Sequence, residues 1–223
     1  MQKLNIFDLI APNDCINCGK QGEIICNNCV HSFVSVVPSE CFRCSKQTQN
    51  FKLCPGCYKL LTIKHLWRAC YYDQPAKQII NTLKFQPNRS MALKIAELID
   101  VMVPYQDWLV VPLPTAPQRA RQRGFDHANL IAKEFAKLRN ISSSHTLLRA
   151  SNTRQVGTKK TERWRQTKDI FLINKTGVVR GATILLIDDV VTTGASLSEA
   201  AKTLKKAGAK SVSAAVYAVA RLN

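Results

Sequence analysis

The sequence lacks an apolar run long enough to cross a membrane, and its first residues lack the apolar core of a signal peptide. A membrane-spanning helix needs about 20 predominantly apolar residues in a row, and no run approaches that length. The opening residues read MQKLNIFDLIAPND, in which polar and acidic residues interrupt the apolar ones. We therefore expect a soluble protein of the cytoplasm without a transmembrane segment.

Acidic residues are scarce, since 15 Asp and Glu stand against 32 Lys and Arg in 223 residues. The resulting net charge of +17 indicates a polyanionic partner, which is a nucleic acid, a phosphorylated ligand or an anionic membrane surface. Residues 119–180 alone contain 15 Lys and Arg but 4 Asp and Glu, so most of the excess lies there. The length permits one large or two small domains, and a hydrophobic content of 46% is ordinary for a globular protein.

Cysteine, by contrast, is abundant. Eight of the nine cysteines form four Cys-x-x-Cys pairs, and the ninth, Cys70, lies in the apolar run LWRACYY, where we expect a buried core thiol. In a reducing cytosol, repeated pairs of this kind indicate metal binding rather than disulfides. The paired residues are Cys15, Cys18, Cys26, Cys29, Cys41, Cys44, Cys54 and Cys57.

The spacing of the pairs predicts two metal sites of four cysteines each. It is C-x2-C-x7-C-x2-C, then eleven residues, then C-x2-C-x9-C-x2-C. This hairpin-like pattern favours tetrahedral zinc over an iron–sulfur cluster or a redox dithiol. Zinc would stabilise a segment with few apolar residues by roughly 10–16 kcal/mol per site. We expect the first two pairs to share one zinc and the last two another, although a cross-braced pairing also fits the spacing. Gly19 and Gly56 are expected to turn the chain tightly beside the sulfurs.

A strand, a loop and a helix follow one another near the C-terminus. Residues 183–187, TILLI, are β-branched and apolar, which predicts a strand buried on both faces of a sheet. Asp188 and Asp189 come next, then a small, hydroxyl-rich loop, and then a helical pattern over residues 197–207 with Gly208 as its C′ glycine. Open α/β sheets bind their ligands at the carboxyl ends of such strands.

This loop is a predicted phosphate site. A favourable charge at a helix N-terminus contributes roughly 0.3–2 kcal/mol, and each charge-assisted hydrogen bond contributes about 1.5–3 kcal/mol. The carboxylates of Asp188 and Asp189 cannot bind a phosphate, but they accept hydrogen bonds from sugar hydroxyls. The candidate phosphate-binding residues are Val191, Thr192, Thr193, Gly194, Ala195 and Ser196.

A second anion site is predicted after the strand expected at residues 108–112, WLVVP. The sequence that follows, PLPTAPQRARQRGFD, is rich in proline, which ends the strand. We expect a loop that carries Arg119, Arg121 and Arg123 into a helix beginning at His127. Three guanidinium groups in one such loop indicate an anionic ligand.

The remaining pattern predicts an α/β fold. Further strands are expected at residues 66–72, 144–148, 171–175 and 210–220, and two helices that form a hood over the sheet are expected at residues 75–85 and 91–102. Lys84, at the end of the first of these helices, either reaches a bound phosphate or points into solvent. Residues 151–168 are basic and almost free of core residues, so we expect a long loop that is either functional or disordered.

Four apolar residues, two acids, two spacers and Thr-Thr-Gly resemble the signature of type I phosphoribosyltransferases, which bind 5-phosphoribosyl-1-pyrophosphate. The resemblance implies a parallel sheet flanked by helices, with Asp188 and Asp189 as catalytic residues that hold the ribose hydroxyls directly or through water on Mg²⁺. It also implies that residues 192–196 cradle the 5′-phosphate and that the three arginines balance the pyrophosphate. In such an enzyme the loop at residues 151–168 would close over the site as a lid that excludes water. Purine-salvage relatives carry an aspartate at the position of Thr192, so their usual base near the purine is absent here.

Along nearly its whole length the chain resembles the ComF competence-protein family, which joins a double zinc ribbon to a phosphoribosyltransferase domain. Besides the cysteines and the acidic motif, the likeness lies in Leu83-Lys84-Phe85, Val111-Pro112-Leu113-Pro114, Arg123-Gly124-Phe125, Thr153, Gln155, Arg163 and Phe171. It implies a zinc-ribbon module at residues 1–60 and a phosphoribosyltransferase-like domain at residues 61–223. The departures from the family pattern are Asp126 and His127 in place of Asn-Gln, and Thr158 and Gln166 in the lid.

Three functions follow from these resemblances. The first is transfer of a phosphoribosyl group to a nitrogen acceptor, with pyrophosphate as the leaving group. The second is a non-catalytic competence factor that binds single-stranded DNA, works with the DNA-uptake machinery and is regulated by phosphoribosyl pyrophosphate. The third is a scaffold with a vestigial pocket, whose function would survive the loss of both Asp188 and Asp189.

Overall fold

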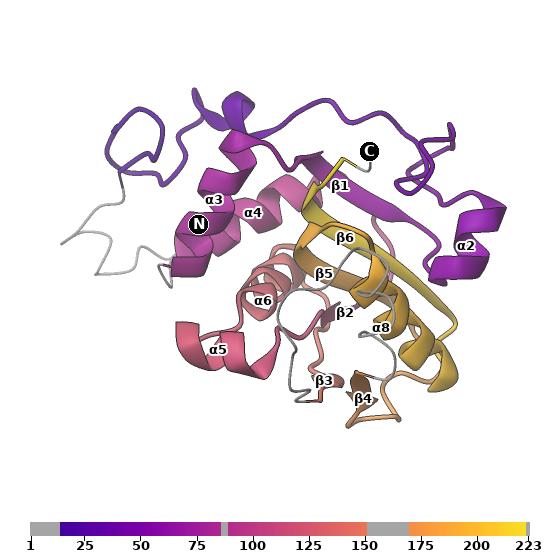
Figure 1. Cartoon of the computed structure of the whole chain (residues 1–223). Coiled ribbons are helices and arrows are strands. Elements are labelled where there is room, and N and C mark those ends of the chain that lie inside the picture. Colours follow the sequence, from indigo (N-terminus) through magenta and orange to yellow (C-terminus); the bar gives the residue numbers. More distant parts are fainter. Residues whose placement is uncertain (1–13, 86–88, 151–169, 222–223) are drawn as a thin grey trace.

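The computed structural model describes residues 14–85, 89–150 and 170–221. Its centre is a parallel four-stranded sheet in the order β1-β6-β5-β2 (Figure 1). The strands are β1 (Leu66–Tyr71), β2 (Leu109–Pro112), β5 (Thr183–Val191) and β6 (Ser211–Val219). With helices on both faces, this sheet confirms the predicted fold class. The last strand, β6, lies inside the sheet because it is apolar on both faces.

The predicted strand at residues 183–187 is too short, because β5 continues through both carboxylates to Val191. Over this stretch it stays paired with β6, with Asp188 opposite Val216. The ladder satisfies backbone groups that a buried loop would leave unpaired. The two carboxylates therefore lie inside the end of the strand, and the connection to the next helix shrinks to residues 192–194.

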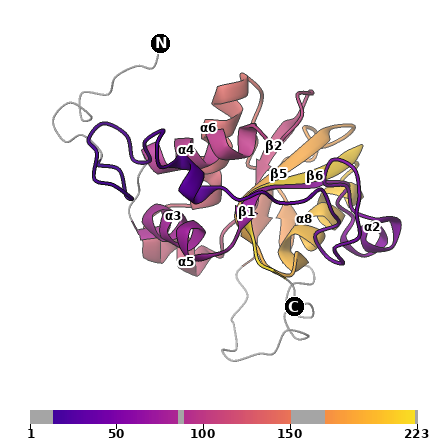
Figure 2. The same cartoon turned by 90° about the horizontal axis from the view of Figure 1, so that it is seen from above.

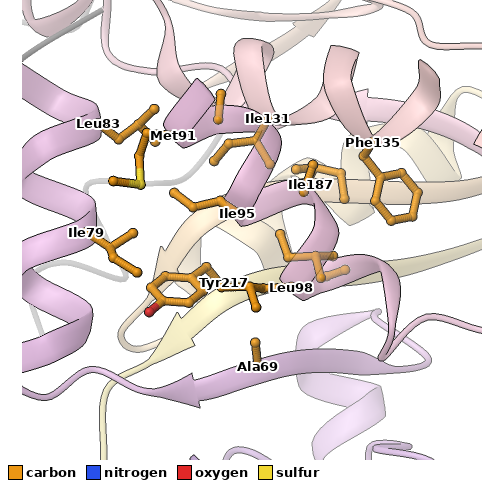
Figure 3. Close-up of a cluster of buried hydrophobic side chains, with 14 of the residues drawn as sticks. Ala69, Ile79, Leu83, Met91, Ile95, Leu98, Ile131, Phe135, Ile187 and Tyr217 are labelled. Atoms are coloured by element: carbon orange, nitrogen blue, oxygen red, sulfur yellow. The ribbon is translucent and has the colours of Figure 1, made fainter. Parts of the chain in front are cut away.

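Three helices cover one face of the sheet. They are α3 (Gln74–Phe85), α4 (Arg89–Asp100) and α6 (His127–Arg139). Each buries one apolar stripe against strand residues that point to the same side, such as Ile187 and Tyr217 (Figure 3). All three helices are confirmed predictions, and each begins within two residues of its expected start. Cys70 is buried as predicted, with 2% of its surface exposed.

The other face is covered mainly by α8 and α2, as Figure 2 shows from above. The elements on this side are α8 (Ala195–Lys206), α2 (Pro55–Leu61) and an antiparallel pair of β3 (Leu147–Arg149) and β4 (Phe171–Ile173). The strands predicted near residues 144–148 and 171–175 therefore exist, but they pair with each other outside the main sheet. Each buries only one residue, Leu147 or Phe171, which is too few for a sheet buried on both faces.

The prediction that a loop carries the three arginines is wrong, because Pro117–Arg123 form the short helix α5. Pro117 occupies the first turn, where a missing N–H leaves no helical hydrogen bond unmade, and the Gln, Arg and Ala that follow are good helix formers. Gly124 ends the helix in the left-handed conformation with φ of 78°. The prolines therefore do two things here: they end the strand β2, and Pro117 starts a helix.

The two cysteine segments lie over opposite faces of the sheet (Figure 1). Residues 14–29 lead into the 3-10 helix η1 (Val30–Phe33) beside α3, and residues 40–54 lead into α2 beside α8. The chain between them crosses the edge strand β1, where Tyr71 N donates to Ser35 Oγ at 3.1 Å. Each segment adds its buried residues to the core on its own side.

None of the helices in the described ranges is both long and apolar enough to cross a membrane. The predicted lid at residues 151–168, which includes Thr153, Gln155 and Arg163, lies outside the described residues.

Candidate functional site

Two carboxylates end the central strand β5 at the carboxyl edge of the sheet. Asp189 is buried, with 4% of its surface exposed, and Asp188 is half-buried. Neighbouring N–H groups steady both side chains, since Asp189 N donates to Asp188 Oδ1 at 2.9 Å and Val190 N donates to Asp189 Oδ1 at 2.8 Å. A buried carboxylate is costly without a cationic partner, so the groups that face Asp189 decide what the site can do.

Two basic side chains contact Asp189, and a third contacts one of these two. Lys84 Nζ, from the end of α3, lies 2.5 Å from Asp189 Oδ2. His127 Nε2, from the first turn of α6, lies 3.4 Å from Asp189 Oδ1, and Arg123 Nη1 lies 3.2 Å from His127 Nδ1. The imidazole tautomer with its hydrogen on Nε2 satisfies both contacts, because Nδ1 then accepts from Arg123 while Nε2 donates to Asp189.

These contacts give the two acids opposite pKa shifts. Burial alone raises the pKa of Asp189, but the hydrogen bond from His127 and the charge of Lys84 outweigh it and lower the pKa below its usual range. Burial, and next the negative charge of Asp189, raise the pKa of Asp188 well above its usual range. The pair therefore resists carrying two negative charges until a further cation arrives.

Asp188→Asn is expected to stabilise the folded chain at neutral and alkaline pH. The folded pKa of Asp188 lies above the unfolded value of about 4, so its ionisation costs folding free energy as pH rises through these values. Asn stays neutral and keeps an oxygen that can accept from Asp189 N. Thermal unfolding should show a higher midpoint for the variant at pH 8, and the difference should vanish below about pH 4. A lower midpoint at pH 8 would contradict the assigned cause.

Asp189→Asn should show the opposite sign in the same melts. A lowered pKa contributes stability above the unfolded value, and that contribution is lost as pH falls through the folded value. Asp189→Asn should therefore lower the midpoint at pH 8.

The predicted phosphate-binding residues form a tight turn between β5 and α8. Residues 192–194 make the turn, and α8 begins at Ala195. Gly194 is the N-cap, with φ of 76°, and has no side chain to cap the helix. Ala195 N lies 3.4 Å from Thr193 Oγ1, a long contact, and Thr193 and Ser196 are half-buried. The helix N-terminus and nearby hydroxyls thus offer donors to an outside anion.

The three arginines of α5 are of two kinds. Arg123 contacts His127 and through it the acidic pair. Arg119 and Arg121 are exposed, and within the described residues neither forms a hydrogen bond or ion pair with the acids or with the phosphate turn. The structure therefore brings one of the three predicted arginines to the site and leaves two on the surface of a helix beside it.

The two described departures from the family pattern both have structural partners. Asp126 caps α6 by accepting from Asn129 N at 3.3 Å and also accepts from Thr115 N at 3.0 Å. Asp126 thus joins the residue before α5 to the first turn of α6. His127 reaches Asp189, as described above.

Oxygen and nitrogen donors of His127, Asp188 and Asp189 lie within 4.8 Å of one another. Carboxylate oxygens are preferred ligands of Mg²⁺, which usually keeps several waters and takes further oxygens from phosphate. The acidic pair therefore fits an Mg²⁺ held directly or through water. Because Lys84 already contacts Asp189, the lysine and a metal ion would share one carboxylate.

The paired cysteines gather into two clusters, as the sequential pairing predicts, and the cross-braced alternative is wrong. One cluster is Cys15, Cys18, Cys26 and Cys29, and the other is Cys41, Cys44, Cys54 and Cys57. The Sγ atoms of Cys18 and Cys26 lie 3.7 Å apart, as do those of Cys44 and Cys54. Two sulfurs on one tetrahedral zinc lie about 3.8 Å apart when each Zn–S bond is about 2.3 Å, whereas a disulfide needs about 2.05 Å. Both clusters therefore fit zinc.

Both clusters begin with the same backbone turn. Gly19 N donates to Cys15 O and Ser45 N donates to Cys41 O, each at 2.8 Å. Gly19 and Ser45 both have positive φ, 73° and 53°, so the predicted turn at Gly19 is confirmed. The predicted turn at Gly56 is wrong, because that glycine lies in α2.

Four thiols in one cluster compete to ionise. In the second cluster, a backbone N–H and the thiol of Cys57 lower the pKa of Cys54 to about 7. Burial, followed by hydrogen bonding with Cys54, raises the pKa of Cys57. A divalent cation removes this conflict because it binds the thiolate forms.

Sequence reasoning found the acids but missed their partners. It left Lys84 open between phosphate and solvent, and it named His127 as the start of a helix and a departure from a family pattern but not as a partner of the acids. A signal for His127 existed, because the loop after β2 and the end of β5 meet at one edge of a parallel sheet. No comparable rule places the end of α3, and with it Lys84, beside Asp189.

Comparison with known proteins gives the class of this domain. The family model described as a phosphoribosyl transferase domain matches residues 121–221, which include α6, the acidic pair and the phosphate turn. The region that forms the site is thus similar to phosphoribosyl transferase domains.

The sequences of two similar proteins identify the family within this class. Competence protein ComFC of Bacillus subtilis (strain 168) is 32% identical over 146 residues, which are 63% of this chain and 58% of the relative. Competence protein ComFC of Streptococcus pneumoniae (strain ATCC BAA-255 / R6) is 30% identical over 175 residues, which are 71% of this chain and 77% of the relative. The chain belongs to the ComF family of competence proteins. The match spans little more than half the length of the Bacillus protein.

A solved structure also aligns with the chain. It is the allosteric regulatory enzyme of purine biosynthesis, which aligns with a TM-score of 0.43 at 16% identity, over 57% of this chain and 25% of that one. The fold class rests on the parallel sheet and its covering helices instead.

Proposed function

We propose that the chain binds 5-phosphoribosyl-1-pyrophosphate together with Mg²⁺ at the carboxyl edge of the sheet. The observation that carries the proposal is that one strand, β5, delivers both parts of a site. It ends in an acidic pair of which Asp189 is buried, and after a three-residue turn the uncapped N-terminus of α8 follows. The 5′-phosphate would lie against residues 192–196. The ribose would lie over Asp188 and Asp189, whose oxygens accept from its hydroxyls.

The pyrophosphate group would lie on the side of α5. Arg123 is already tied to the acidic pair through His127, and the exposed Arg119 and Arg121 supply further guanidinium groups for phosphate oxygens. Mg²⁺, when bound, would neutralise charge between the pyrophosphate and the acidic pair. Phosphate oxygens would also offer Lys84 an alternative partner to Asp189.

The same arrangement supports transfer of the phosphoribosyl group to a nitrogen acceptor. In that reaction the bond between C1 of the ribose and pyrophosphate breaks, a C1–N bond forms, and positive charge develops on the ribose ring. The chain would contribute by positioning the ribose and balancing the charge of the leaving group. Thr192 stands where purine-salvage relatives carry a carboxylate, so we propose ligand binding as the primary function and transfer as a second step.

Isothermal titration calorimetry of the full chain with Mg²⁺ present tests this binding. We expect one saturable site for phosphoribosyl pyrophosphate, and we expect adenosine 5′-monophosphate to compete for the phosphate turn. Absence of both binding heat and competition would overturn the proposal.

The family and the charge favour a second candidate function, which is binding of single-stranded DNA during DNA uptake. Relatives carry the name competence protein, the net charge is +17, and Arg119 and Arg121 are exposed on α5. Neutralising Z phosphates of single-stranded DNA gives a slope of about −0.7Z when log affinity is plotted against log salt.

For a real DNA footprint we expect a slope steeper than about −3. Changing both Arg119 and Arg121 to Ala should flatten it by about 1.4. Fluorescence anisotropy with a labelled oligonucleotide measures both slopes. A wild-type slope flatter than about −1 would contradict DNA binding as a function of this chain.

A further inference from the structure

We propose that Phe42 is a positioning residue through which the second cysteine cluster holds the phosphate turn in its binding shape. The inference deepens the proposed function and rests on it, because it assumes that residues 192–196 bind a phosphate. Phe42 lies between Cys41 and Cys44 in the sequence, far from the phosphate turn, and no motif connects the two.

The contact is made by the tip of the phenyl ring. An ideal Cβ built on Gly194 would lie 2.6 Å from Phe42 Cζ and 3.4 and 3.5 Å from Cε1 and Cε2. The nearly equal distances to the two Cε atoms show that the ring points its para position at Gly194. A side chain there would collide with the ring, and the φ of 76° disfavours a side chain independently. Gly194 is therefore required both by its conformation and by Phe42.

The ring is itself held in place. Phe42 is 6% exposed, and Cys41 beside it is fully buried. The backbone turn closes with Cys41 N donating to Lys46 O and Ser45 N donating to Cys41 O, each at 2.8 Å. Phe42 also belongs to the same apolar cluster as Val191 and Leu197, which lie on either side of the phosphate turn.

A second tie joins the cluster to the same helix. The cluster's last two cysteines, Cys54 and Cys57, lie at the start of α2, and Leu60 follows on that helix. Leu60 O accepts from Ser198 Oγ, in the first turns of α8, at 3.2 Å. Ser198 is fully buried. Phe42 and Leu60, which lie beside the two halves of the cluster in the sequence, thus both contact the segment that begins at Gly194.

The first cysteine cluster has no such role and offers a matched comparison. It packs on the opposite face, where Gln78 Nε2 of α3 donates to Ile16 O at 2.9 Å. Phe33, just after this cluster, is 2% exposed and belongs to the core on that face. It is therefore a buried phenylalanine next to a cysteine cluster but away from the phosphate turn.

The geometry has a consequence for ligand affinity. The N–H groups at the start of α8 bind an anion well only when the turn before them keeps its direction. Loss of one charge-assisted hydrogen bond to the phosphate costs about tenfold or more in affinity. Loosening the ring should therefore weaken ligand binding beyond what lost stability explains.

The test compares Phe42→Leu with Phe33→Leu in the full chain. Thermal unfolding reports the stability lost from each core, and calorimetry with phosphoribosyl pyrophosphate and Mg²⁺ at 25 °C reports affinity. We expect both variants to lose thermal stability. Phe42→Leu should also lose about tenfold or more in affinity, while Phe33→Leu stays within about twofold of wild type. Equal losses of affinity, or none in Phe42→Leu, would overturn the inference.

Phe42→Tyr is the second variant, and it retains the buried ring. Its added oxygen extends from Cζ directly toward Gly194, so we expect weaker binding with a folded, zinc-loaded chain. Unchanged affinity in Phe42→Tyr would overturn the inference even if Phe42→Leu does not fold. If the wild-type chain itself binds nothing, the proposed function fails and this inference fails with it. If the wild-type chain binds the ligand and the Phe42 variants bind it with the same affinity, the proposed function stands and only this inference fails.

Discussion

Substitution of Cys41 by Ser is expected to release one of two zinc ions and to unfold the segment of residues 40–57. Cys41 is fully buried, and its Sγ belongs to the second four-cysteine cluster. We propose that this cluster holds zinc, since its sulfur spacing of 3.7 Å fits a tetrahedral ion. Structural zinc binds with about 10–16 kcal/mol, which is comparable to the whole stability of a typical domain, about 5–15 kcal/mol.

Cys70→Ser is the matched control for this substitution. Cys70 is also buried, at 2% exposed, but its thiol donates to Tyr217 O and belongs to neither cluster. We expect metal analysis to find two zinc ions per chain in wild type and in Cys70→Ser, and one in Cys41→Ser. Two zinc ions in Cys41→Ser, or fewer than two in a folded wild-type chain, would contradict the assignment.

Asp189→Asn is expected to reduce the affinity for phosphoribosyl pyrophosphate by about 100-fold. The loss has two causes in the structure. The amide accepts only weak hydrogen bonds from ribose hydroxyls or metal-bound water. It also no longer balances the charge of Lys84, and it accepts a weaker hydrogen bond from His127. Two charge-assisted hydrogen bonds, each worth about 1.5–3 kcal/mol, are enough for this effect.

Glu97→Gln provides the control for Asp189→Asn. It makes the same chemical change on α4, where the half-buried Glu97 pairs with Lys94 at 2.8 Å. Calorimetry should find its affinity within about twofold of wild type, since in the described residues Glu97 pairs with Lys94 and not with the acidic pair or the phosphate turn. An Asp189→Asn chain that is folded and binds within about threefold of wild type would remove the acidic pair from the proposed site. That result would favour a vestigial pocket instead.

Local patterns predicted the parts of the site that are continuous in sequence. The strand, acids, turn and helix around Asp189 occupy one short stretch, and their composition reflects burial and backbone conformation directly. The cysteine pairs likewise lie close enough in sequence for their spacing to indicate two sites. Element boundaries were less certain, because pairing with β6 extended β5 through the carboxylates and proline helped to start α5.

Contacts between distant segments could not be predicted in the same way. Lys84 meets Asp189 only because α3 packs on one face of the sheet. Phe42 meets Gly194 only because the second cysteine segment packs on the other. Helical spacing shows which face of a helix is buried, but not which residues of another segment its ends will touch.

Phosphorus NMR of phosphoribosyl pyrophosphate, titrated with the full chain and Mg²⁺, tests the central claim most directly. The 5′-phosphate and pyrophosphate groups give separate resonances, so the measurement reports both halves of the proposed site. The account predicts that both sets of resonances shift or broaden as the chain is added. A 5′-phosphate resonance that stays unchanged would contradict a phosphate site at residues 192–196, even if the pyrophosphate binds elsewhere.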